Sequence, residues 1–303
     1  MFTDGTGRLQ PIWAFVLSGL LSCAAFFVAA YAAAALAGDH VLRFEAIFRP
    51  VLVALLLGSF SWLLTVGDHV EDHCIAAQGL PISPGWARQL TAGCAIGFLL
   101  VMVAVIPVAI GGHIVFRTVL TPHTLPKAAA VVIVLILGAL AEELMFRGYP
   151  FQRLVAGVGV AGAIVVFSVL FGVVHLSNPG ASVWGLINTV AIGVLFALAY
   201  LRTGALWLPW GIHFAWNAAL GFVLGLPVSG LRLFNVAVQA TAEGPKWLTG
   251  GSYGVEASVS GTIAICVGFV VIWRYPFHRL VSPRERSSAE NQIEPSSELL
   301  ISR

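Results

Sequence analysis

Long apolar runs separated by shorter polar stretches dominate the chain. A helix needs about 20 mostly apolar residues to cross a bilayer. Eight runs are close to this length or exceed it: 12–37, 48–66, 90–112, 128–156, 160–176, 183–201, 205–225 and 258–274. The pattern predicts an all-α, polytopic membrane protein with about eight transmembrane helices and no separate soluble domain.

The runs group into four predicted parts. Helices one to three occupy 1–126, a core of helices four to seven occupies 127–225, a loop and the last helix occupy 226–275, and a polar tail occupies 276–303. The first run is too long for the 7–15-residue apolar region of a secretory signal, so we expect it to be retained. Eight spans place both termini on one side, which carries more basic residues. This favours cytoplasmic termini. The Ala- and Gly-rich composition indicates the cell membrane of a bacterium.

Composition and charge agree with a membrane protein. Of the 303 residues, 58% are hydrophobic and 10% are charged, whereas soluble domains carry about 25% charged residues. The net charge is only +2, and the basic residues are scattered, which argues against nucleic acid as a partner. The four cysteines show no paired spacing that would indicate a disulfide framework or a Cys-x-x-Cys metal site.

Two adjacent carboxylates interrupt the fourth apolar run. Between Asp72 and Glu243, the only acidic residues are Glu142 and Glu143, near the middle of that run. A charge at the centre of a membrane costs about 2.5–3.5 kcal/mol and indicates a functional site by default. Glu143 lies four residues before Arg147, on the same helix face, and can pair with it. Glu142 lies about 100° further round the helix and needs a different partner.

Two later runs contain further polar residues. If helices four and five form a hairpin that turns at 157–159, Glu142 and His175 lie at the same depth, about 25 Å from the turn, and can share a water molecule. In the seventh run, His213 and Asn217 are four residues apart and occupy one helix face. Polar side chains can also simply hold membrane helices together. Three runs that each supply polar groups favour a shared site over this alternative.

This set of side chains is suited to hydrolysis. A glutamate can act as general base on water, and imidazoles and an amide can stabilise an oxyanion. Glu142, His175 and His213 could instead bind zinc with an open position for water. The chain lacks His-Glu-x-x-His, the strongest helical zinc motif. The spacing does not decide between a site without a cofactor and a zinc site.

A second group of histidines and acids occupies 68–74, with the sequence Asp-His-Val-Glu-Asp-His-Cys. Its glutamate does not follow the first histidine directly, so it is not the zinc motif named above. The group falls in a polar connection between two apolar runs. We interpret it as a solvated loop, with adventitious or regulatory metal binding as the alternative.

Together, the motifs on three separate runs resemble those of the CPBP, or Abi, family of intramembrane proteases, which includes the CAAX prenyl proteases. The resemblance covers about residues 127–220. Its three motifs are Glu142-Glu143-x-x-x-Arg147, Phe171-x-x-x-His175 and His213-x-x-x-Asn217. The flanking residues also fit: His175-x-x-Asn178-Pro179, Asn188 with Gly193, and Thr203-Gly204-x-Leu206-Trp207.

The resemblance implies an intramembrane endopeptidase acting on membrane-anchored or prenylated proteins or peptides within the lipid. It implies that Glu142 activates water with help from His175, and that His213 and Asn217 stabilise the oxyanion. Glu143 and Arg147 would support the site. Family members have been described both as metalloproteases and as metal-independent glutamic proteases. The glutamic mechanism is favoured here because an asparagine is a good oxyanion donor and a poor zinc ligand.

Two other function classes stay open. Intramembrane glutamates and histidines also build proton relays, so a proton- or ion-coupled transporter is one alternative. Such a transporter would more readily show an internal repeat or paired broken helices, and the sequence shows neither. The other alternative is a non-catalytic immunity or binding protein that uses the same residues for recognition.

Overall fold

A computed structural model describes residues 10–37, 74–111, 114–118, 124–232, 237–274 and 276. The predicted span over 48–66 lies outside these ranges. So do residues 68–73 of the histidine-containing loop and the polar tail beyond 276. The fold is therefore discussed only for the described part of the chain.

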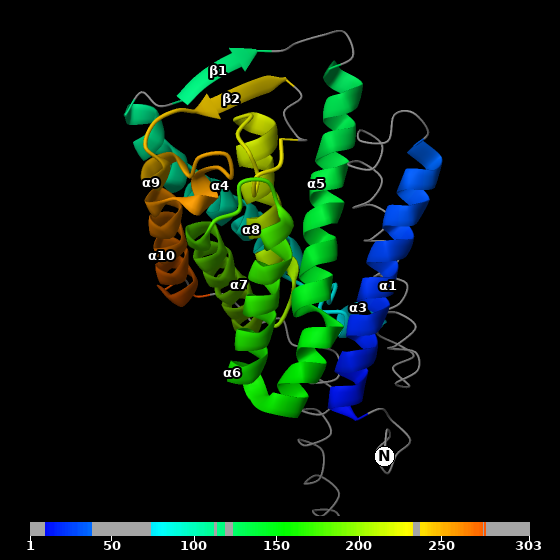
Figure 1. The fold of residues 1–303 in the computed structure, drawn as a ribbon. Helices are drawn as coiled ribbons and strands as arrows, with labels where there is room; N and C mark the ends of the chain where they lie inside the picture. Colours follow the sequence, from blue (N-terminus) through cyan, green and yellow to red (C-terminus); the bar gives the residue numbers. More distant parts are fainter. Residues whose placement is uncertain are drawn as a thin grey trace, which may run out of the picture.

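The described chain is mainly helical (Figure 1). Its α-helices are α1 (Pro11–Ala37), α3 (Cys74–Ala77), α4 (Trp86–Ile110), α5 (Thr124–Arg147), α6 (Tyr149–Val174), α7 (Val183–Thr203), α8 (Trp207–Asn217), α9 (Lys246–Thr249) and α10 (Val259–Arg274). Short 3₁₀ turns form η2 (His175–Ser177) and η4 (Val255–Ala257), and α8 continues as a π-helix, η3 (Ala218–Val223).

The prediction of an all-α fold is confirmed for the bundle but misses a small sheet. Strands β1 (Ile114–Thr118) and β2 (Val238–Ala242) pair antiparallel, with Ile114 opposite Ala242. They cover one end of the bundle (Figure 1). The two strands are five residues each and lie far apart in sequence, so neither forms a hairpin that a local pattern would reveal.

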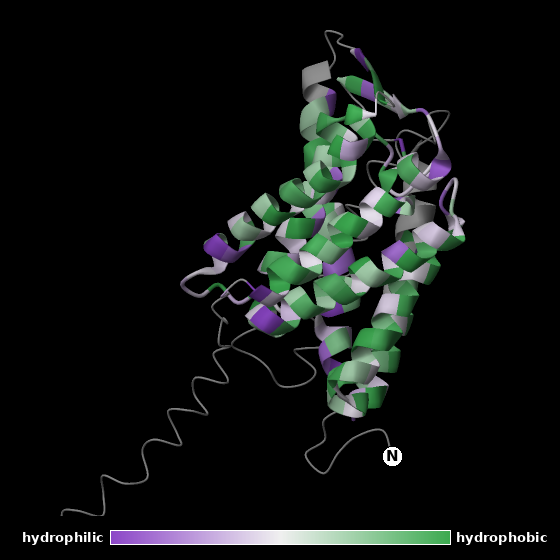
Figure 2. Ribbon diagram, turned by 90° about the vertical axis from the view of Figure 1, so that its left-hand side faces the viewer, coloured by the Kyte–Doolittle hydropathy of each residue, from purple (hydrophilic) through white to green (hydrophobic). Residues whose placement is uncertain are grey.

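Several helices have the length and apolar composition of membrane spans. Within the described residues, three stretches suffice to cross a membrane: Trp86–Ile110, Lys127–Ser177 and Val183–Thr203. Two shorter apolar helices are Pro11–Leu21 and Val259–Arg274. Figure 2 shows mostly hydrophobic helices, with hydrophilic residues near their ends and a few within the bundle. The total of eight spans stays a prediction.

The predicted run over 128–156 is broken in the structure. Helix α5 ends before Gly148, whose ψ of −143° is not helical, and α6 starts with Pro150 in its first turn. Proline suits a first turn because its missing N–H has no helical partner there. Further along α6, Gly159 has φ 80° and ψ 168° and bends the helix. The chain therefore turns at Gly159, within the predicted turn.

A close contact between α4 and α8 fixes the helix that carries His213. A β-carbon on Gly93 would lie 2.4 Å from the Leu208 carbonyl oxygen, and one on Gly97 would lie 2.4 Å from that of Ile212. Small residues spaced four apart allow membrane helices to approach this closely. The backbone of α4 therefore sets the position of α8 beside it.

A methyl group at this contact should destabilise the protein. We expect Gly97→Ala to lower stability by about 1–3 kcal/mol, because Ile212 or α4 must shift to make room. Gly19→Ala in α1 is the matched control, since a β-carbon there meets no atom within 4 Å. Thermal unfolding in detergent should show a lower melting temperature for Gly97→Ala alone. Equal melting temperatures would contradict the close contact.

Candidate active site

The buried carboxylate of Glu143 lies at the centre of the polar cluster. Its side chain is fully buried. Arg147 Nη1 donates to Glu143 Oε1 at 3.2 Å, which is the pair that the spacing within α5 predicts. His213 Nδ1 lies 2.8 Å from the same oxygen and donates to it. Glu143 thus joins α5 to α8.

Arg147 connects this pair to a third helix and to aromatic rings. Its Nη2 donates to the Gly193 carbonyl of α7 at 3.2 Å. Its guanidinium lies 4.5 Å from the centre of the Phe171 ring and 5.1 Å from that of Phe196. A β-carbon on Gly193 would lie 2.9 Å from Ser168 Cα, so glycine also allows α6 and α7 to approach. The motif arginine is thus satisfied by a carboxylate, a carbonyl and π faces.

The contacts of His213 orient its two nitrogens differently. Because Nδ1 donates to Glu143, Nε2 faces the other glutamate, 3.6 Å from Glu142 Oε2. The ring also stacks on Phe196, with centroids 5.1 Å apart and planes at 21°. A carboxylate behind an imidazole fixes its tautomer and direction. The residue is therefore held with Nε2 towards Glu142.

Glu142 differs sharply from its neighbour. Its side chain is 38% exposed. Its Oε2 is buried and accepts no hydrogen bond within the described ranges. The expected partner was His175, but the group that approaches Glu142 in the structure is His213. An unpaired carboxylate oxygen beside an imidazole has the capacity to bind and deprotonate a water molecule.

His175 lies in η2, directly after α6. Its Nδ1 lies 2.6 Å from the Phe171 carbonyl oxygen, so Nδ1 carries the hydrogen and donates. The Phe171 ring lies 4.8 Å from the His175 ring and 6.3 Å from the His213 ring. Both imidazoles thus use Nδ1 for support and border the same aromatic side chain.

Asn217 is the last residue of α8, four residues after His213. It is half-buried, and its amide makes no hydrogen bond with the part of the chain that the structure describes. The helix changes from α to π immediately after it, at Ala218. Single π-helical turns occur often at functional sites. The amide is therefore available to bind another group.

The described residues do not form a ready three-ligand zinc site. No group of three histidine, cysteine, aspartate or glutamate side chains in the described chain is placed to hold one ion, whereas a structural or catalytic zinc needs three or four ligands around a single point. The Nδ1 bonds of His213 and His175 leave both Nε2 atoms able to bind an ion, since a histidine that binds a metal usually donates its other N–H to a carboxylate or carbonyl. Zinc held by Glu142, His175 and His213 therefore stays the alternative to a mechanism without metal.

Sequence reasoning missed the contribution of the connection between η3 and α10. Asn178 donates to the Ser229 carbonyl at 2.9 Å, and Asn188 donates to the Glu256 carbonyl at 2.8 Å. Both asparagines flank the family motifs, but their partners lie well beyond them in sequence. The available signal was Glu256 itself, an acidic residue three positions before the last apolar helix begins.

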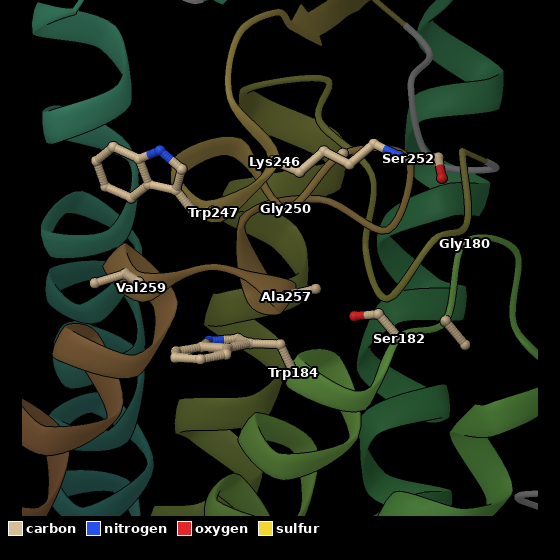
Figure 3. Close-up of a pocket in the computed structure, with 11 residues that line it drawn as sticks. Gly180, Ser182, Trp184, Lys246, Trp247, Gly250, Ser252, Ala257 and Val259 are labelled. Atoms are coloured by element: carbon tan, nitrogen blue, oxygen red, sulfur yellow. The ribbon is translucent and has the colours of Figure 1, made fainter.

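A cavity of about 440 Å³ lies beside this connection (Figure 3). Trp184, Lys246, Trp247 and Ala257 contribute to its walls. None of the predicted catalytic residues lines it. The two tryptophans are 48% and 62% exposed, and such side chains with a lysine are typical of the membrane–water interface. The cavity is thus separate from the polar cluster at Glu142.

Replacing the buried Arg147 should destabilise the protein more than replacing an exposed arginine. Arg147→Leu leaves Glu143 buried without its cation, and we expect a loss of about 3–5 kcal/mol. Arg88→Leu on α4 is the control, because Arg88 is exposed and surface changes usually cost within about 0.5 kcal/mol. Melting temperatures in detergent compare the two. A similar small change in both variants would contradict a structural role for Arg147.

The comparisons with known proteins agree with the motifs. Residues 124–219 match the family model of the Rce1-like type II CAAX prenyl endopeptidases. This confirms the resemblance over about a third of the chain, the segment from α5 to η3. Searches of curated proteins and of solved structures gave no match. The family match implies a protease of the CAAX type that acts at the membrane.

Proposed function

We propose that the chain, whose residues 124–219 match the Rce1-like family, is an intramembrane endopeptidase that hydrolyses peptide bonds by a glutamic mechanism. The single observation that carries the proposal is the contrast between two adjacent glutamates. Glu143 is fully buried, and its Oε1 is paired with both Arg147 and His213. Glu142 is 38% exposed, and its Oε2 makes no hydrogen bond within the described residues and lies 3.6 Å from His213 Nε2. The first has the environment of a structural residue, and the second has that of a general base.

The proposed reaction begins with a water molecule bound by Glu142. The Glu142 carboxylate takes a proton as the water oxygen attacks the carbonyl carbon of the scissile peptide bond, with His175 assisting. The resulting tetrahedral oxyanion accepts hydrogen bonds from the Asn217 amide and from His213 Nε2–H. His213 donates from Nε2 as well as Nδ1 because its ring is protonated on both nitrogens, a cation that lies between Glu142 and Glu143. Glu142 then returns its proton to the amide nitrogen, and the C–N bond breaks. The products are a carboxylate and an amine.

The supporting contacts explain why this geometry persists. Glu143 holds the His213 ring from behind, and Arg147 offsets the charge of Glu143. Preorganised donors stabilise a developing charge without having to reorganise during the reaction. The substrate class is a peptide attached to the membrane, with a prenyl group as the favoured anchor. The family description and the apolar helices support that choice.

Neutralising Glu142 should remove catalysis without unfolding the protein. We expect Glu142→Gln to lower kcat by about 10²–10⁴-fold, the usual contribution of a general base. The assay compares a fluorogenic prenylated peptide with the same peptide lacking the prenyl group, using purified protein in detergent. Glu243→Gln, at an exposed glutamate, is the matched control and should cleave normally. Unchanged cleavage by Glu142→Gln would overturn the proposed mechanism.

Chelation should separate the glutamic from the metal-dependent mechanism. Because no catalytic step passes through a metal, we expect full cleavage after dialysis against a strong chelator, with no zinc in elemental analysis of the active protein. Loss of cleavage that added zinc restores would instead support a metalloprotease. A chelator-treated sample of unchanged melting temperature is needed to exclude unfolding.

A further inference from the structure

Glu256 occupies η4, outside the segment that matches the family model. One carboxylate oxygen, Oε1, accepts a hydrogen bond from Trp216 Nε1 at 2.9 Å. The other, Oε2, accepts one from the backbone N–H of Ser229. Burial raises the pKa of Glu256, against the opposing effects of these two bonds and of the nearby His175. A partly buried carboxylate with two donors thus lies beside the proposed site.

The first of these bonds fixes the end of the helix that carries the oxyanion donors. Trp216 directly precedes Asn217 and is 6% exposed. The α-helix gives way to a π-helix from Ala218, whose N–H is the last to bond to a carbonyl four residues earlier, that of Phe214. The indole bond to Glu256 therefore anchors the side chain next to Asn217 at this junction.

The second bond is to Ser229, which in turn contacts the loop that follows His175. Ser229 has φ 45°, an uncommon conformation for a residue with a β-carbon, and such strain is retained where the surroundings enforce it. The Ser229 carbonyl accepts from Asn178 Nδ2 at 2.9 Å. The Asn178 N–H in turn donates to the His175 carbonyl at 3.1 Å. The chain of bonds thus runs from Trp216 through Glu256 to His175.

The backbone of Glu256 is itself held by α7. Asn188 Nδ2 donates to the Glu256 carbonyl at 2.8 Å and to the Ser258 carbonyl at 3.1 Å. Asn188 Oδ1 accepts from Thr262 Oγ1 at 2.9 Å. Glu256 therefore belongs to a segment whose backbone is held in place. A residue can position other side chains only if its own backbone is held in this way.

We propose that Glu256 is a positioning residue for the proposed peptide hydrolysis, which sets Asn217 and His175 relative to each other through its bonds to Trp216 and Ser229. This role rests on the proposed function. It adds a residue from outside the three family motifs to the machinery that aligns them. A small displacement of a catalytic group can cost about 10²-fold in rate, so loss of this alignment should lower kcat more than it raises KM.

Two variants disturb these bonds from opposite sides. Glu256→Gln leaves one accepting oxygen for two donors, so it loses the bond to Trp216 or the bond to Ser229. Trp216→Phe removes the indole N–H while keeping an aromatic ring. We expect each to lower kcat by about tenfold on the prenylated peptide, with KM changed less than about twofold. The double variant should be no slower than the slower single variant. Glu243→Gln, with an exposed carboxylate, is the matched control.

The Asn217→Ala background distinguishes positioning from a general effect on stability. If Glu256 acts through Asn217, adding Glu256→Gln to Asn217→Ala should change kcat by less than about twofold. A merely structural residue would lower kcat equally in both backgrounds. Melting temperatures report folding, and Trp216→Phe tests the same bond if Glu256→Gln does not fold.

The outcomes separate this proposal from the proposed function. An active wild type with unchanged kcat in both single variants overturns the positioning role alone. If Glu256→Gln lowers kcat equally in the wild type and in the Asn217→Ala variant, the positioning role is overturned as well. A folded wild type that cleaves neither the prenylated nor the plain peptide overturns the proposed protease function, and the positioning role with it.

Discussion

The burial of the Glu143 carboxylate is the constraint on which the rest of the site depends. A charge without partners inside a protein carries a desolvation penalty of several kcal/mol, so Glu143 requires both of its donors. Arg147 approaches from the same helix and His213 from α8. Arg147 also bonds to the Gly193 carbonyl of α7. Pairing the Oε1 atom of one carboxylate thus fixes three helices, and this leaves Glu142 as the glutamate that is accessible and bound to neither Arg147 nor His213 by a hydrogen bond.

The bonds of Glu143 are one set of contacts that hold the site. A second set of hydrogen bonds connects the site to the segment between η3 and α10. There the asparagines that flank the motifs bond to backbone carbonyls, and Glu256 bonds to an indole. The Glu143 set is charged and joins helices to one another. The second set consists mainly of side chains that form hydrogen bonds with the backbone of loops. The first set holds α8 at His213, whereas the second bonds to α8 at Trp216 and to the loop that follows His175. Both are needed to explain how residues from α5, η2 and α8 come to lie together.

Local patterns predicted the features that depend on neighbouring residues. The helices follow from runs of apolar residues, and the pair of Glu143 with Arg147 follows from a spacing of four within one helix. The bond from His213 to Glu143 could not be predicted, because 70 residues separate the two and only the packing of α8 brings them together. The same applies to Glu256. Its residue type was visible in the sequence, but its partners depend on the path of a loop.

Two boundaries differ in how far the sequence announces them. The apolar run over 128–156 was predicted as one span, but it contains Gly148 and Pro150, residue types that often mark a helix boundary, and a non-helical Gly148 divides it. The β1–β2 pair joins segments on either side of the whole core. The strand pairing is a tertiary contact that no local pattern reveals. The break at Gly148 and the turn at Gly159 instead coincide with glycine and proline residues in the sequence itself.

The glycine contact between α4 and α8 has a consequence for the length of chain that can function alone. The matched segment begins at residue 124, but Gly93 and Gly97 on α4 form the surface against which α8 rests. At the other end, the contacts continue to η4 and α10. The smallest piece that retains these supports runs from the start of α4 to the end of α10. The three motifs therefore carry the family resemblance, while the segment that keeps these supports is nearly twice as long as the matched one.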